Sequence, residues 1–300
     1  MIDEYCRTGL IEPEQLMPCL NDPNQEKQIR LIDASFALPN APNDPAQTFQ
    51  QMRIDDAAFF SIDEIADHTT DLPHMLPDAQ TFSDGVSSLG ISNDDFIVVY
   101  DQTGIGMAAC RIWWMFHVFG HDRVVVLNGG LPAWRTAGYP LNTNPPAAIQ
   151  QAGQFKARIV HTEMVADRNI VLAALDHLPA PHIIDMRPAA RFSGQAPEPR
   201  TGLRTGHIPG SRNLPWSTLV DPGTGKLKPA DTLESTIKSA GITPGEPVIC
   251  SCGSGVSACV LAFALYHLGY GHNPVYDGSW AEWGQESCPT PVECSFAQNS

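Results

Sequence analysis

Residues 248–269, VICSCGSGVSACVLAFALYHLG, combine a short apolar run, a loop of small residues and a helix-like segment. The run up to Cys250 has the β-branched character of a buried strand. The segment from Ala258 is apolar and ends at Gly269, as helices commonly do. Cys252 stands where the strand ends and the loop begins. A strand followed by a loop and a helix predicts an α/β fold with a parallel sheet.

The same pattern occurs earlier in the chain. RLIDASF around Asp33 resembles HIIDMRP around Asp185, and SLGISNDDFIVVYD, ending at Asp101, resembles SAGITPGEPVICSC, ending at Cys252. NGGLPAW (128–134) resembles DGSWAEW (277–283), and RIDDAAFF (53–60) resembles HIPGSRNL (207–214) more weakly. The nearly constant spacing of these pairs predicts a duplicated domain.

We therefore predict two tandem α/β domains, each a parallel sheet flanked by helices, at residues 1–143 and 144–300. A length of 300 residues suits two domains of about 150 residues each. The segment 140–154, rich in Pro, Asn, Gln and Ala, is the predicted linker.

Composition excludes several classes of partner. The formal net charge of −15 disfavours nucleic acid and anionic membranes, which carry the same sign of charge. No apolar run approaches the roughly 20 residues that cross a bilayer. We see neither a secretory signal nor a mitochondrial presequence, so we expect a cytoplasmic protein. The 8 cysteines are then expected to be thiols, and Cys250 and Cys252 form only Cys-x-Cys, so we expect no metal site.

Cys252 is the candidate nucleophile. Ligands of open parallel sheets bind beyond the carboxyl ends of the strands, where Cys252 is expected. The following residues, Gly253, Ser254, Gly255, Val256 and Ser257, are small enough for their N–H groups to form an anion-binding nest in front of a helix N-terminus. Such a setting favours the nucleophilic thiolate. Cys250 and Cys259 are expected to pack in the core.

Three other enzyme classes fit less well. Protein phosphatases with a similar loop place an arginine where this chain has Ala258, and that arginine clamps phosphate. The GIG at 104–106 is only a fragment of a dinucleotide-binding fingerprint. A papain-like protease would surround its cysteine with different residues.

The loop CGSGVSA, with YDGSW.EW after it and GHIPGS before it, resembles the catalytic half of the tandem rhodanese family. DHTTDLPHMLP and RIWWMFHVFGH extend the resemblance into the first half, so it covers nearly the whole chain. Within the family the chain most resembles 3-mercaptopyruvate sulfurtransferases. Thiosulfate-using rhodaneses usually carry basic residues in this loop, and this loop carries none.

The resemblance implies a sulfurtransferase in which Cys252 takes sulfur from 3-mercaptopyruvate as a persulfide, releases pyruvate and passes the sulfur on. It implies that Arg191 and Arg200 hold the substrate carboxylate and ketone, a task that suits the planar guanidinium. The acceptor would be a low-molecular-weight thiol, a thioredoxin-like protein or cyanide, and no cofactor is needed. Ser254 either passes a proton to the leaving enolate or only hydrogen-bonds within the loop. Arg187, beside Asp185, is expected to be structural.

The first half is expected to be non-catalytic, because Asp101 stands at the position equivalent to Cys252. Family members commonly have HIPG where this chain has RIDD, with Arg53 first, which puts a proton relay through that histidine in doubt. His74, in PHMLP, is expected to be structural. Two alternatives stay open, a thiosulfate sulfurtransferase and a persulfide carrier with little turnover. The sequence does not predict which of these acceptors is physiological, the oligomeric state, or the roles of Cys288 and Cys294.

Overall fold

The computed structural model describes residues 2–24, 28–37, 44–104, 106–157, 161–176 and 180–295. The chain forms two compact units. Unit 1 comprises Met1–His68, Leu76–His161 and Val220–Leu227, and unit 2 comprises Thr69–Met75, Thr162–Leu219 and Lys228–Ser300. The boundary between residues 143 and 144 stays a prediction, because these units are defined by contacts and not by where a duplicated sequence ends.

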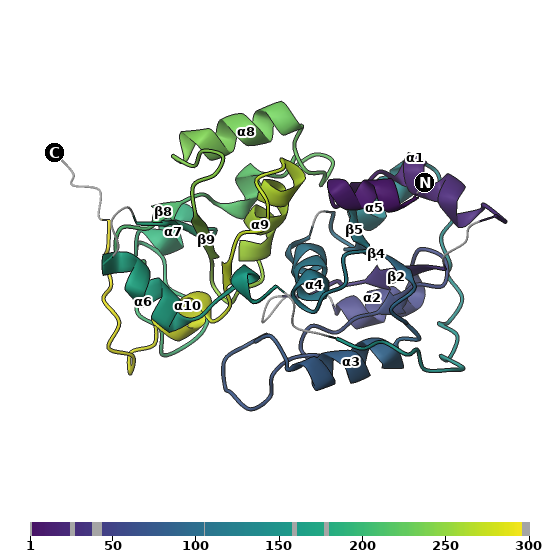
Figure 1. Cartoon of the computed structure of the whole chain (residues 1–300), viewed down its shortest axis with the longest axis horizontal. Coiled ribbons are helices and arrows are strands. Elements are labelled where there is room, and N and C mark those ends of the chain that lie inside the picture. Colours follow the sequence, from purple (N-terminus) through teal and green to yellow (C-terminus); the bar gives the residue numbers. More distant parts are fainter. Residues whose placement is uncertain are drawn as a thin grey trace. The chain divides into compact units, whose positions relative to one another are not determined.

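Unit 1 contains a five-stranded parallel sheet in the order β1-β5-β4-β2-β3. Helices flank this sheet (Figure 1). The strands are β1 (Leu10–Ile11), β2 (Ile29–Asp33), β3 (Ala58–Phe59), β4 (Phe96–Tyr100) and β5 (Val124–Leu127). The helices are η1 (Ile2–Arg7), α1 (Pro13–Leu20), α2 (Pro45–Gln51), α3 (Ala79–Ser88), α4 (Met107–Val118) and α5 (Gly130–Thr136).

Unit 2 repeats this topology with the order β6-β10-β9-β7-β8, also parallel. Its strands are β6 (Val165–Ala166), β7 (His182–Asp185), β8 (Arg212–Asn213), β9 (Val248–Ser251) and β10 (Val275–Tyr276). Its helices are η2 (Thr162–Met164), α6 (Arg168–Asp176), α7 (Ala189–Phe192), η3 (Trp216–Thr218), α8 (Ala230–Ser239), α9 (Ala258–His267) and α10 (Ser279–Trp283).

The two sheets confirm the predicted fold class of two α/β domains. Each repeated motif lies on equivalent elements: Asp33 and Asp185 end β2 and β7, and Asp101 and Cys252 follow β4 and β9. The weaker motif pair, RIDDAAFF and HIPGSRNL, also lies on equivalent elements, because the two motifs contain β3 and β8.

Burial explains why the central strands read as unbroken apolar runs. All five residues of β4 and all four of β9 are buried, because helices cover both faces of a parallel sheet. Helix α9 is apolar on every side, and its first eight residues are buried. The loop that contains Cys252 therefore joins a buried strand to a buried helix, two rigid supports for a chemical site.

Candidate active site

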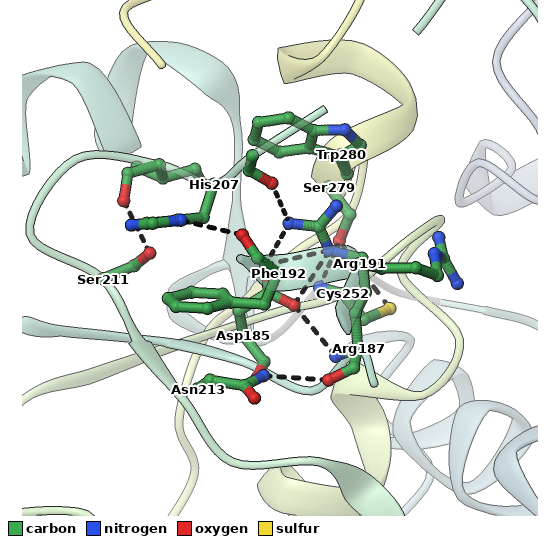
Figure 2. Close-up of polar contacts among 12 residues, drawn as sticks. Asp185, Arg187, Arg191, Phe192, His207, Ser211, Asn213, Cys252, Ser279 and Trp280 are labelled. Carbon is green, nitrogen blue, oxygen red and sulfur yellow. Dashed lines mark hydrogen bonds and ion pairs between the residues drawn. The ribbon is translucent and has the colours of Figure 1, made fainter. Parts of the chain in front are cut away.

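Cys252 follows β9 directly and is only 1% exposed. Its N–H donates to Ser279 Oγ at 3.1 Å, and its carbonyl oxygen accepts from the N–H of Trp280 at 3.0 Å. The carbonyl of Gly253 accepts from the N–H of Ala281 at 2.8 Å. The first turn of α10 thus holds the backbone on both sides of the sulfur (Figure 2).

Ser279 is itself held in an unusual conformation. Its φ of 47° lies in the left-handed region that side chains other than glycine rarely adopt, and it is completely buried. Its Oγ lies 2.7 Å from the carbonyl oxygen of Tyr276 and 3.9 Å from Cys252 Sγ. The one hydroxyl hydrogen can therefore point to the carbonyl or to the sulfur.

The loop after Cys252 presents backbone donors. Among the residues that the structure describes, the N–H groups of Gly253, Ser254, Val256 and Ser257 donate to no protein acceptor. Gly255, with φ of +74°, gives the loop its curvature. Donors of this kind at the start of a buried helix suit a bound anion. The loop carries no cationic side chain.

The neighbouring cysteines lie in different surroundings. Cys250 is completely buried in β9, and burial raises the pKa of its thiol well above the ordinary value. Cys259 is completely buried in α9 and donates from Sγ to the Gly255 carbonyl at 3.3 Å. Both positions fit the packing role expected for them.

Arg191 is the cation that lies against the loop. A Cβ placed on Gly253 would lie 3.1 Å from Arg191 Nη2, so the guanidinium borders the space that a side chain at Gly253, next to Cys252, would enter. The side chains of Arg191 and Cys252 extend toward the same side in Figure 2. The Nε and Nη2 atoms of Arg191 both donate to Glu198 Oε2, Nε at 3.1 Å.

Arg187 is buried in a hydrogen-bond network that shares Glu198 with Arg191. Its Nη2 donates to Asp185 Oδ2 at 2.7 Å and to the Gly206 carbonyl at 2.8 Å, and its Nη1 donates to Glu198 Oε1 at 2.7 Å. The guanidinium lies 4.3 Å from the ring centroid of Trp280 (Figure 2). These contacts join β7 to α10, as expected of a structural arginine.

Arg200 lies beside His74, a contact that the sequence did not suggest. Arg200 Nη2 is 3.2 Å from His74 Nε2, and both residues belong to unit 2. A guanidinium only donates, so Nε2 of His74 is the acceptor if this contact is a hydrogen bond. Arg200 also borders a cavity of about 410 Å³ that is lined in part by Asp71, Ala281 and Glu286.

The corresponding loop of unit 1 is filled by a carboxylate. Asp101 is 3% exposed, and its Oδ1 accepts from the N–H and Oγ1 of Thr103 at 2.9 and 2.6 Å. A Cβ on Gly106 would lie only 1.7 Å from Asp101 Oδ2, so the side chain occupies the loop. Burial raises the pKa of Asp101 to about 6. Arg53 is also buried, and its Nη1 donates to the Asn144 carbonyl at 2.6 Å.

Two further cysteines lie near the C-terminus of the described chain. Cys288 is 8% exposed, and Arg168 Nη1 lies 3.5 Å from its sulfur. Burial raises the pKa of Cys288, but hydrogen bonds from Thr290 and Arg168 lower it more, so the net direction is downward. Cys294 is exposed. The surroundings of Cys288 and Cys294 assign neither residue a role in the reaction.

Within the described ranges, no group of three or more His, Cys, Asp or Glu side chains is placed to hold a metal ion. In the same part of the chain, no helix has the length and apolar character needed to span a membrane.

The fold and the loop define the class of protein. The family model for the rhodanese-like domain matches residues 17–137 and again residues 169–286. The chain therefore belongs to the rhodanese family, as the sequence motifs predicted.

Comparison with relatives of known name indicates which enzymes of the family the chain is similar to. The chain is 39% identical to thiosulfate/3-mercaptopyruvate sulfurtransferase 1, mitochondrial, of Arabidopsis thaliana, over 94% of this chain and 78% of that protein. It is 38% identical to 3-mercaptopyruvate sulfurtransferase of Escherichia coli strain K12, over 95% and 98%. The crystal structure of SseA from Escherichia coli, described as a 3-mercaptopyruvate sulfotransferase with the rhodanese fold, superimposes with a TM-score of 0.80. That structure is 37% identical and covers 91% of this chain and 99% of its own.

The predicted resemblance is thereby confirmed, and the similarity identifies the class of enzyme as a transferase of sulfur-containing groups. Sequence reasoning did not find three contacts at the site: Ser279 behind Cys252, Glu198 on Arg191, and His74 on Arg200. Only the contact of Ser279 had a signal in the sequence that could have suggested it, because Ser279 lies in the repeated tryptophan motif DGSWAEW.

Proposed function

We propose that this chain transfers the sulfur of 3-mercaptopyruvate through a persulfide on Cys252 to a thiol or cyanide, releasing pyruvate. The supporting observation is the loop itself. A buried sulfur is followed by backbone donors without a protein acceptor among the described residues, and Arg191, which lies beside the loop, is paired with the carboxylate of Glu198. Such a loop suits a sulfur anion better than a compact dianion.

In the first half-reaction, the Cys252 thiolate attacks the thiol sulfur of the donor. The S–S bond forms as the bond between sulfur and C3 of the donor breaks, and its electron pair leaves on the pyruvate enolate. A proton then converts the enolate to pyruvate. Arg191 and Arg200 bind the carboxylate and ketone of the donor, and Ser254 is the candidate for delivering the proton.

In the second half-reaction, an acceptor thiolate or cyanide attacks the outer sulfur. The S–S bond breaks, its electron pair returns to Cys252 as thiolate, and the acceptor leaves as a persulfide or thiocyanate. The N–H groups of Gly253, Gly255, Val256 and Ser257 stabilise the persulfide between the two steps. The transferred group is the sulfur itself, so the scheme uses no metal or organic cofactor.

A thioredoxin-like protein or a small thiol is the proposed acceptor, and neither nucleic acid nor a membrane is a proposed partner. The cytoplasmic location stays a prediction, since one relative is named as a mitochondrial protein. Thiosulfate is the second candidate donor, because the name of the Arabidopsis relative includes it.

The test is steady-state turnover with mercaptopyruvate and with thiosulfate, using cyanide or a dithiol as acceptor. We expect the higher kcat/KM for mercaptopyruvate and a mass increase of one sulfur atom on the peptide that contains Cys252. Cys252→Ser should abolish transfer with either donor and leave the fold intact, while Cys250→Ser serves as the matched control. Turnover that survives Cys252→Ser would refute the site. A higher kcat/KM for thiosulfate would refute the donor, and a stable persulfide without turnover would indicate a carrier.

A further inference from the structure

Glu198 is a buried carboxylate shared by two arginines. Its side chain is 1% exposed, with Oε1 accepting from Arg187 Nη1 and Oε2 accepting from Nε and Nη2 of Arg191. A carboxylate so deeply buried is stable only while its charge is compensated. Glu198 is therefore an integral part of the arginine cluster beside the cysteine loop.

The charges in this cluster are balanced. Arg187 has Asp185 as its own partner, with contacts at 2.7 to 3.1 Å, and both side chains are at most 2% exposed. Glu198 is then the carboxylate that compensates Arg191, the most exposed of the four side chains at 22%. The cluster meets the loop as an ion pair and not as a free positive charge.

The pairing still leaves Arg191 able to bind a ligand. Glu198 takes only Nε and Nη2, and in the described part of the chain Nη1 donates to no protein acceptor. An outward edge of the guanidinium can therefore receive one carboxylate. Arg191 would stabilise a donor with two charges at the sulfur much less than a free guanidinium would. The reason is that Glu198, within hydrogen-bonding distance of the same guanidinium, repels the donor.

We propose that Glu198 determines donor preference. It holds Arg191 against Gly253 and compensates its charge, so that the site accepts a donor with one carboxylate remote from sulfur and disfavours the thiosulfate dianion. Glu198 acts through Arg191 and is a positioning residue. This inference rests on the proposed function and adds to it the residue that selects between the two donors.

Glu198→Gln removes the charge and keeps the size of the side chain. We expect the ratio of kcat/KM for thiosulfate to kcat/KM for mercaptopyruvate to rise about tenfold, which corresponds to about 1.4 kcal/mol between the two transition states. The gain should diminish at high salt, because Arg191 is partly exposed. Glu234→Gln on the surface of α8 is the matched control, since it removes the same charge from an exposed ion pair, and its donor ratio should equal that of the wild type.

Glu198→Asp provides the second variant if Glu198→Gln does not fold. It keeps the charge but withdraws it from Arg191 by one methylene, so the donor ratio should move in the same direction by a smaller factor. Equal loss of kcat/KM for both donors in a folded variant would overturn the role of Glu198 and show a merely structural carboxylate. Absence of mercaptopyruvate turnover in the wild type would instead refute the proposed function, so the two failures are distinguishable.

Discussion

Replacing Asp101 by asparagine measures how much unfolding free energy unit 1 loses because it has a carboxylate at the position equivalent to Cys252 of unit 2. Asp101 is 3% exposed, and its Oδ1 accepts two hydrogen bonds from Thr103. An asparagine has nearly the same shape, and its side-chain oxygen can accept the same bonds. The substitution therefore changes the charge and leaves the packing close to its original state.

The expected magnitude follows from the pKa of Asp101, which burial raises from 3.8 to about 6. Between these values the folded state binds a proton that the unfolded state has released, so Asp101 makes the protein less stable as pH rises. A shift of roughly two pKa units corresponds to about 3 kcal/mol. Asparagine does not titrate, so the stability of Asp101→Asn relative to wild type should increase by about 2 to 2.5 kcal/mol of this total between pH 4 and 7.

The assay is urea unfolding of both proteins across this pH range, followed by tryptophan fluorescence and fitted to the transition of unit 1. Asp94→Asn is the matched control, because the Asp94 side chain is fully exposed and loses the same charge. Its stability relative to wild type should stay constant with pH. A difference in stability between Asp101→Asn and wild type that does not change from pH 4 to 7 would refute the raised pKa of Asp101.

Further substitutions test the other contacts. His121, whose pKa burial lowers to about 4, should stabilise the fold increasingly as pH rises from 4 to 6.5, so His121→Gln should flatten the pH profile in urea unfolding. Ser279→Ala leaves the buried N–H of Cys252 without its acceptor and should lower the unfolding free energy by about 1–3 kcal/mol, whereas the exposed Ser287→Ala should change it little; equal effects would argue against the contact. Arg200→Ala should raise the KM for mercaptopyruvate roughly 10- to 100-fold with a smaller change in kcat, and unchanged kinetics would exclude Arg200 from donor binding.

The repeats made much of the fold predictable from the sequence. The apolar run that ends at Cys250 identified a strand that is buried on both faces, and Gly269 predicted where α9 ends. The position of Cys252 followed from the same reasoning, because a residue directly after a buried parallel strand lies at the edge where ligands bind. These patterns are local, and in a duplicated domain each of them occurs twice in the sequence.

The side-chain partners were not predictable in this way. Arg191 and Arg200 look alike in the sequence, yet one is paired with Glu198 and the other contacts His74, which is 126 residues away in the chain. Arg53 attracted notice as a departure from the family motif, but only the structure shows its guanidinium bound to the carbonyl of Asn144. Hydrogen-bond partners depend on how loops pack, and hydrophobic periodicity carries no information about them.

The sequence by itself determined that this protein has two tandem α/β domains and that one loop carries a cysteine where the other carries Asp101, because strand and helix patterns depend on local residue order. The resemblance of its motifs to the rhodanese family then implied which α/β domains these are. The tertiary structure decided how that cysteine is surrounded. Ser279 lies behind it, backbone donors follow it, and Arg191 lies beside it as a compensated charge. The physical reason is burial: a buried charge requires a partner, and folding alone decides which residue is close enough to provide it.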